Sequence, residues 1–305
     1  MHSSQWILTE DQFMKPAYRI SPFSTASIGL NSSHPRSDLA DDYFAARYPG
    51  YSASWTMKGR GAIALALADL ALKPNSVVTI LTTSANTYVS GCVTREIERF
   101  CQWNRALTDN TDAVLVIHEF GSLYPDMASL YASGLPIIED YAHAFHSVAP
   151  HEPRGDYAIY SFPKYFPIQY GGVLLSKKPL RVLSDTPAEN ERYLKNVISA
   201  GIPLIDKWRQ QRIEHHAWLE AAFQPLGCAP RFAWQPYETP SVFMFTTPDE
   251  INLPELKCFM QEHGVESSIF YGEKAFFIPL HHNLCTVDLN YFVSLYRCFV
   301  DHKNR

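Results

Sequence analysis

The sequence predicts an α/β protein in which helices sandwich a mainly parallel sheet and a smaller α+β domain follows. Two observations predict this fold. β-Branched apolar runs such as SVVTIL (76–81) and AVLVI (113–117) alternate with segments of helical period as far as about residue 200. Beyond that point, a long helical region leads into short strands and further helices. We therefore expect a large domain over residues 1–200 and a small C-terminal domain over 201–305.

Composition narrows the classes of function. Of the 305 residues, 46% are apolar and 19% charged, which is enough to bury a sizeable core. A net charge of -5 offers no positive field for nucleic acid or a membrane surface, so small molecules are the expected partners. The most apolar long segment, 62–72, is interrupted by Asp69 and is too short to span a bilayer. The first residues lack the pattern of a signal peptide, and we expect a cytoplasmic protein.

The six cysteines are scattered along the chain, and none forms a Cys-x-x-Cys pair. Their spacing does not favour a zinc or redox site, so we expect buried free thiols and no metal.

Residues 1–50 are rich in Ser, Pro and Asp, and we expect irregular structure with short helices there. A short extended run then precedes Gly59, Arg60 and Gly61, which open an Ala/Leu-rich helix ending near Leu72. Free backbone N–H groups at such a helix start suit a phosphate, although a plain helix start is the alternative.

The next segments alternate between strand and helix. A strand is expected at 76–81, followed by the loop TTSANTY and an amphipathic helix as far as about Trp103. A strand with its loop at 112–121, a short helix at 127–133 and a strand at 135–139 continue the pattern. In parallel sheets, ligands bind beyond the carboxyl ends of the strands, so the residues that follow these strands are site candidates.

The C-terminal part begins with a helical region over 185–223, broken at 201–203 by Gly and Pro. We expect a strand at 241–247, a helix at 253–264 stopped by Gly264, a short strand near 264–271 and a last helix over 287–300.

Residues 136–178 carry the clearest chemistry. An apolar strand ends in Glu139 and Asp140, and a second apolar run delivers Ser161 and then Lys164, the only lysine between residues 73 and 177. An acid and an amine at adjacent strand ends suit pyridoxal phosphate (PLP): the acid keeps the ring nitrogen protonated, and the amine binds the aldehyde covalently. An N-cap or metal ligand is the alternative for Asp140, and a solvated surface amine is the alternative for Lys164.

Other polar residues nearby remain open between two interpretations. Ser161 either donates to a phosphate or satisfies the strand end. His143, three residues after Asp140, and His118, at the end of its strand, are either site residues or hydrogen-bonded structural histidines. The pairs at 215–216 and 281–282 are interpreted as surface or packing residues.

Several segments resemble the DegT/DnrJ/EryC1/StrS family of PLP-dependent sugar aminotransferases. The segment MKGRGAIALALADLAL resembles the family's Ser-Gly-Thr-Ala-Ala-Leu helix start, and VLVIHEFG resembles its Val-His-Leu-Tyr-Gly strand. The stretch PIIEDYAHAFHS resembles Val-Ile-Glu-Asp-Ala-Ala-Gln-Ala, and GDYAIYSFPKYFPIQYGGVLLS resembles the segment from Ser-Phe through the cofactor-binding lysine to Gly-Gly. HGVESSIFY and FFIPLHHNLCTVDLNYFV resemble the small-domain strand and closing helix. The resemblance implies the aspartate-aminotransferase fold, PLP-dependent transferase type I.

The family resemblance also implies roles for individual residues. Lys164 would bind PLP covalently and shuttle the proton, and Asp140 would pair with the pyridinium nitrogen. His143 would hydrogen-bond the phenolic oxygen of the cofactor.

The remaining implied contacts concern the phosphate and the ring face. The backbone amides of Gly59 and Arg60, with the Ser161 hydroxyl, would hold the phosphate. An aromatic side chain from the TTSANTY loop, Tyr88, would cover the ring.

The implied activity is transfer of an amino group from glutamate or glutamine to a keto sugar, nucleotide-linked, by a homodimer. Only two residues separate Ser161 from Lys164, where the family has four, and the family's Gly-x-Asn-x-Arg interface segment has no counterpart after Lys178. A PLP-dependent dehydratase or eliminase of the same fold, and a non-catalytic binding or regulatory relative, remain alternatives.

Overall fold

The computed structural model describes residues 17–148 and 155–303, which form two compact units. The larger unit contains residues 23–205 together with the short segment 236–239. The smaller unit contains residues 17–22, 206–235 and 240–303.

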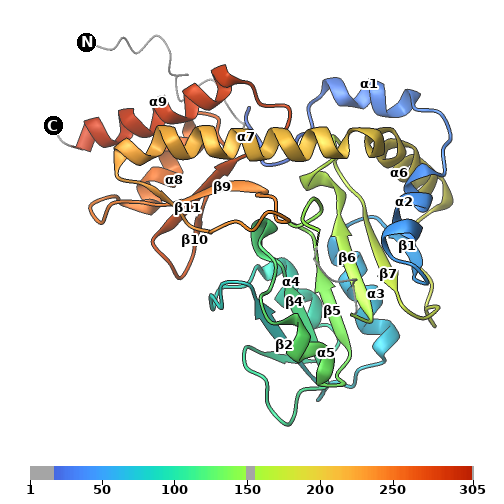
Figure 1. Cartoon of the computed structure of the whole chain (residues 1–305). Helices are drawn as coiled ribbons and strands as arrows, with labels where there is room; N and C mark the ends of the chain where they lie inside the picture. Colours follow the sequence, from blue (N-terminus) through green and yellow to red (C-terminus); the bar gives the residue numbers. More distant parts are fainter. Residues whose placement is uncertain (1–16, 149–154, 304–305) are drawn as a thin grey trace. The chain divides into compact units, whose positions relative to one another are not determined.

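A seven-stranded sheet, in the order β1-β7-β6-β5-β4-β2-β3, forms the centre of the larger unit (Figure 1). The five strands β3, β2, β4, β5 and β6 are parallel neighbours, whereas β7 is antiparallel to both β6 and β1. The strands are β1 (Ser52–Thr56), β2 (Val77–Thr82), β3 (Gln102–Asn104), β4 (Ala113–Ile117), β5 (Ile137–Asp140), β6 (Tyr157–Ser161) and β7 (Gly172–Ser176). The mainly parallel sheet predicted from the alternating pattern is confirmed.

Helices cover both faces of this sheet. The α-helices of the larger unit are α1 (Ala26–Ser33), α2 (Leu39–Arg47), α3 (Gly59–Leu70), α4 (Gly91–Ile97), α5 (Met127–Ala132) and α6 (Ala188–Gly201). Neighbouring residues of β4 show the two covered faces: Leu115 packs in the cluster built on α3, and Val114 in the cluster that includes Leu130 of α5. Both clusters are buried, which explains why the strands are continuously apolar.

One helix is shorter in the structure than the sequence predicted. The helix expected as far as Trp103 ends at Ile97, and Gln102–Asn104 forms the edge strand β3. The Gln102 N–H donates to the carbonyl of Ser76 at 2.9 Å, and β3 pairs in parallel with β2. Pairing with a distant strand therefore overrides the helical pattern of this segment.

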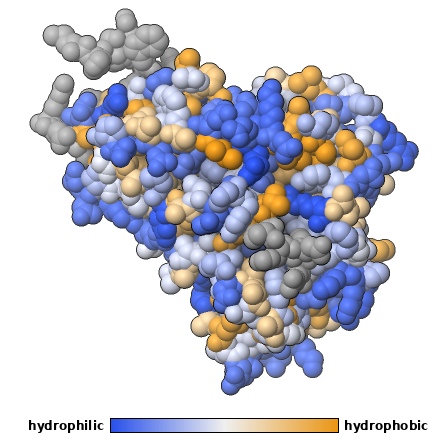
Figure 2. All heavy atoms as spheres, viewed as in Figure 1, coloured by the Kyte–Doolittle hydropathy of each residue, from blue (hydrophilic) through white to orange (hydrophobic). Residues whose placement is uncertain are grey.

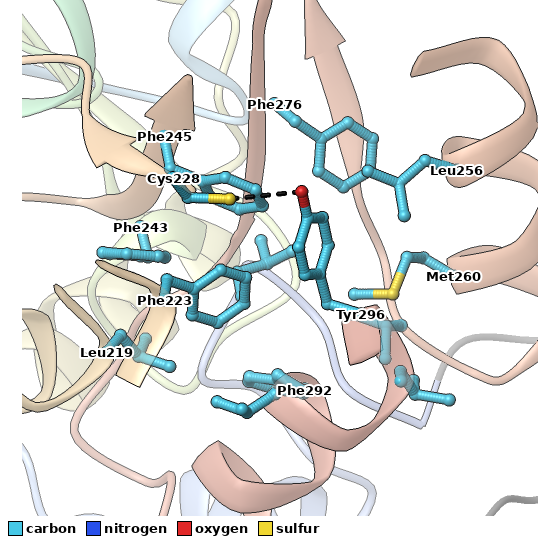
Figure 3. Packing of buried hydrophobic residues seen from close by; sticks show 14 of the residues in the cluster. Leu219, Phe223, Cys228, Phe243, Phe245, Leu256, Met260, Phe276, Phe292 and Tyr296 are labelled. Atoms are coloured by element: carbon cyan, nitrogen blue, oxygen red, sulfur yellow. Dashed lines mark hydrogen bonds between the residues drawn. The ribbon is translucent and has the colours of Figure 1, made fainter. Parts of the chain in front are cut away.

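The smaller unit contains a four-stranded antiparallel sheet in the order β10-β11-β9-β8. Its elements are α7 (Ile205–Phe223), β8 (Ala229–Pro230), β9 (Val242–Thr246), α8 (Leu253–Glu262), β10 (Ser268–Phe270), β11 (Ala275–Pro279) and α9 (Thr286–Lys303). Aromatic side chains from α7, β9 and α9 fill the core, and the Cys228 thiol lies 3.2 Å from the hydroxyl of Tyr296 (Figure 3).

Within residues 17–148 and 155–303, no helix combines the length and apolarity needed to cross a bilayer. Figure 2 shows hydrophobic and hydrophilic residues interspersed on the face in view. Cys101 and Cys228 are buried free thiols, but Cys92, Cys258 and Cys285 are exposed, so the expectation of buried thiols is wrong for those three. The residues that the structure describes contain no cluster of His, Cys, Asp and Glu able to hold a metal ion.

Candidate functional site

Asp140 and Lys164 come together at the carboxyl ends of two neighbouring strands. Asp140 is the last residue of β5, which pairs in parallel with β6. Lys164 ends the short 3-10 turn Phe162–Lys164 that directly follows β6, and the Phe162 carbonyl closes this turn by accepting from the Tyr165 N–H at 2.9 Å. The two side chains interact electrostatically. The turn of only two intervening residues after Ser161 therefore leaves Lys164 close enough to Asp140 for the two charges to interact.

The surroundings favour a neutral amine at Lys164. Burial lowers the pKa of Lys164, and the Asp140 carboxylate opposes that shift. Burial likewise raises the pKa of Asp140, while the Ala142 N–H, which donates to its Oδ1 at 2.7 Å, and the Lys164 charge lower it. Because a neutral amine is the nucleophilic form, this environment suits covalent binding of an aldehyde.

Glu139 serves the structure rather than the site. Its carboxylate is 1% exposed and accepts hydrogen bonds from the Tyr141 hydroxyl at 2.7 Å and the Gly155 N–H at 2.9 Å. Burial alone would raise the pKa of Glu139, but hydrogen bonding and charge from His118, with the bonds from Tyr141 and Gly155, hold it below its ordinary value. Successive strand residues point to opposite faces, so only Asp140 of the acid pair reaches Lys164.

His118 is a hydrogen-bonded structural histidine, the second of the two interpretations left open by the sequence. Its Nδ1 accepts the Tyr124 N–H at 3.0 Å, which leaves the Nε2 proton facing Glu139 Oε2 at 3.4 Å. The ring also packs on Tyr141, with centroids 4.2 Å apart.

The N-terminus of α3 forms a cradle next to Ser161. The amides of Gly61 and Ala62 make the first helical bonds, both to the Lys58 carbonyl, at 2.9 and 3.3 Å. The amides of Gly59 and Arg60 precede those bonds, in the first turn of the helix, where N–H groups have no acceptor within the helix itself. Such a start attracts anions through its N–H groups and the helix dipole.

Close packing in this cradle requires glycine at two positions. A Cβ at Gly59 would lie 3.0 Å from the Ser161 Cβ and 3.3 Å from its Oγ. A Cβ at Gly172, the first residue of β7, would lie 2.7 Å from the Tyr160 carbonyl oxygen and 3.0 Å from the Gly59 nitrogen. The start of α3, Ser161 and the first residue of β7 are therefore packed closely against one another.

Cys92 connects the cradle with Lys164 and was missed by the sequence analysis. The exposed Arg60 side chain donates to the Cys92 Sγ at 3.5 Å, and Cys92, like Asp140 but more weakly, opposes the lowering of the Lys164 pKa by burial. Its position at the start of α4, just beyond the loop after β2, is the sequence signal that could have identified it.

His143 lies in the turns that follow β5, where its ring packs on Phe120 with centroids 4.9 Å apart. Phe120 was also missed by the sequence analysis. Tyr88 is 46% exposed, and its N–H donates to Asn86 Oδ1 at 2.9 Å.

No family model matches the sequence, and no curated protein matches it. Solved structures do match the fold. The aminotransferase TlmJ from Streptoalloteichus hindustanus superposes with a TM-score of 0.74 at 15% identity, over 94% of this chain and all of that chain (100%). Spr1654 from Streptococcus pneumoniae in its PMP form gives 0.70 at 14% identity over 95% and 100% of the two chains, and it was also solved in a PLP form. DesI with its TDP-sugar product gives 0.69 at 12% identity over 94% and 93%. The chain therefore has the fold of these proteins, the PLP-dependent transferase type I fold that its resemblance to the DegT/DnrJ/EryC1/StrS family predicts.

Proposed function

We propose that this protein is a PLP-dependent aminotransferase of the DegT/DnrJ/EryC1/StrS type, which moves an amino group from glutamate or glutamine to a keto sugar. The observation that carries the proposal is the meeting of Asp140 and Lys164 at the ends of adjacent buried strands, within one unit that also holds the α3 cradle. The structural likeness to TlmJ supports the same activity.

The residues present fit PLP. The amides of Gly59 and Arg60 and the Ser161 hydroxyl would be the donors for its phosphate, since the helix start and Ser161 are close neighbours. The Asp140 carboxyl is the partner for its ring nitrogen, because a cation there lowers the pKa of a buried acid and keeps it ionised. His143 is the partner for its phenolic oxygen, and Tyr88 is the aromatic cover for its ring. Bound PLP supplies an aldehyde for amines and a ring that withdraws electrons.

The residues of the chain supply binding, charge and proton transfer. Burial lowers the pKa of the Lys164 amine, which would therefore act as a base. It would move the proton between the substrate carbon and the cofactor carbon that exchange the amino group. The Asp140 carboxylate balances positive charge in the ring throughout. The chain uses the same amine for covalent binding and for proton transfer, so removal of Lys164 abolishes both.

The acceptor is a keto sugar, and we propose that it is carried on a nucleotide. DesI, which has this fold, was solved with a TDP-sugar product. We further propose a homodimer, as the sequence resemblance implies; light scattering that gives twice the chain mass would support it.

The experiment that tests the proposal is spectroscopic. Purified protein incubated with PLP should show a yellow absorbance band that borohydride removes, and the Lys164→Ala variant should show no such covalent band. Added glutamate should then move the band to that of the amine form of the cofactor. A protein that takes up no PLP contradicts the proposal, whereas PLP uptake without a response to glutamate or glutamine favours elimination over transamination.

A further inference from the structure

Glu119 joins the loops that follow β2 and β4. The backbone N–H and the hydroxyl of Ser84 donate to the same Glu119 oxygen, at 2.7 and 2.6 Å. In return, the Glu119 N–H donates to the Thr83 hydroxyl at 3.1 Å, which itself donates to the Ser122 carbonyl at 2.8 Å. Glu119 is 6% exposed, so these charge-assisted bonds form away from water, where they are strong.

Each joined loop holds a non-glycine residue in the left-handed region: Ala85 has φ 58° and Phe120 has φ 53°. Such conformations are disfavoured for residues that have a Cβ, and they persist only where the surroundings impose them. Arg105 also holds the loop after β2, by donating to the Thr82 hydroxyl at 3.0 Å and the Asn86 carbonyl at 2.5 Å. Glu119 and Arg105 therefore both fix this loop, through bonds to different residues.

The left-handed turn places the Phe120 ring against His143, with centroids 4.9 Å apart. A hydrogen bond supports this ring contact: the Ser147 hydroxyl donates to the Gly121 carbonyl at 2.5 Å. That bond ties the segment after β5, which carries His143, to the loop that carries Phe120. The chain of contacts therefore runs from Ser84 through Glu119 and Phe120 to His143.

We propose that Glu119 is a positioning residue for the cofactor site. It locks the two loops together, keeps Phe120 against His143, and so fixes the direction in which the imidazole meets its ligand. The ligand of His143 is PLP, a step that rests on the proposed function.

The test compares Glu119→Ala with Glu119→Gln, whose amide oxygen still accepts from Ser84. Asp126→Ala is the matched control, because Asp126 is an exposed acid of the same unit whose carboxylate accepts the Ser129 N–H at 3.3 Å. PLP affinity is measured by titration of the apo-protein, and loop order by hydrogen exchange of the same apo-protein over residues 82–88 and 118–123. E119A loses both bonds from Ser84 to the carboxylate. We therefore expect it to bind PLP about tenfold more weakly, a ratio that equals about 1.4 kcal/mol, and to exchange about tenfold faster in both loops. E119Q and D126A should stay within about threefold of the wild type.

A double-mutant cycle decides whether the effect passes through His143. In a His143→Ala background, E119A should weaken PLP binding by less than about twofold more. Equal tenfold losses in both backgrounds would overturn the proposed route, as would unchanged exchange in E119A. If the wild-type protein bound no PLP, the proposed function would fail, while the exchange measurement would still decide whether Glu119 locks the loops.

Discussion

Replacement of Gly172 by alanine gives a sharp test of the phosphate cradle. The new Cβ would lie 2.7 Å from the Tyr160 carbonyl oxygen and 3.0 and 3.1 Å from the nitrogen and Cα of Gly59. All three are backbone atoms, so no side-chain rotation relieves the contacts, and either β7 or the start of α3 must move by a few tenths of an ångström. The start of α3 would then be displaced relative to Ser161.

Overpacking of this kind costs roughly 1–3 kcal/mol. For a unit of this size the loss corresponds to a melting temperature lower by roughly 3–9 °C. Because the displaced amides are those proposed to bind the phosphate, we also expect PLP affinity to fall by about tenfold or more. Differential scanning fluorimetry of the apo-protein and a PLP titration by absorbance measure the two effects separately.

Gly61→Ala is the matched control at the same helix start. Its Cβ would lie 3.6 Å from the Thr56 Cβ, an ordinary contact, and alanine is the better helix former. This variant should keep its PLP affinity and gain roughly 0.5–1 kcal/mol of stability. If G172A bound PLP as tightly as G61A, the start of α3 would not be the phosphate site.

Two further predictions concern charge. Asp140→Asn, which keeps the shape but not the charge, should lower the rate of amino transfer from glutamate by about 10²- to 10³-fold in single-turnover absorbance measurements; a rate within about threefold of the wild type would remove Asp140 from the mechanism. His216, which accepts the Trp234 N–H at 3.1 Å, has its pKa lowered by burial from 6.5 to about 4. Because the pKa of His216 is lower in the folded than in the unfolded protein, neutral His216 favours the folded state. Its contribution to the free energy of unfolding is complete above pH 6.5 and falls with the pH, by about 2 kcal/mol at pH 5. Urea unfolding at pH 8 and pH 5 should show a smaller loss in His216→Gln than in the wild type, with His34→Gln as control; equal losses in the wild type and H216Q would contradict the assignment.

Much of the site could be predicted because it depends on local pattern. β-Branched runs identified the strands, and in a parallel sheet the residues after such strands gather at one edge, which singled out Asp140 and Lys164. The Gly59 helix start was equally visible, since glycine before an apolar helical period marks a helix N-terminus.

Long-range pairing decided what local pattern could not. The segment Gln102–Asn104, expected to be helical, is a strand because it pairs with the edge of β2. The surroundings of Glu139 are also set at long range, since three donors from other segments bind its carboxylate.

The sequence by itself determined the fold class and singled out Asp140 and Lys164 as candidates, since strand period and strand ends are properties of neighbouring residues. Only the tertiary structure showed Cys92 beside Arg60, and Phe120 against His143. Those contacts join residues far apart in the chain, and their geometry depends on how loops after different strands bond to one another. The bonds between Glu119 and Ser84 are likewise visible only in the tertiary structure, because nothing in the local sequence relates these two residues.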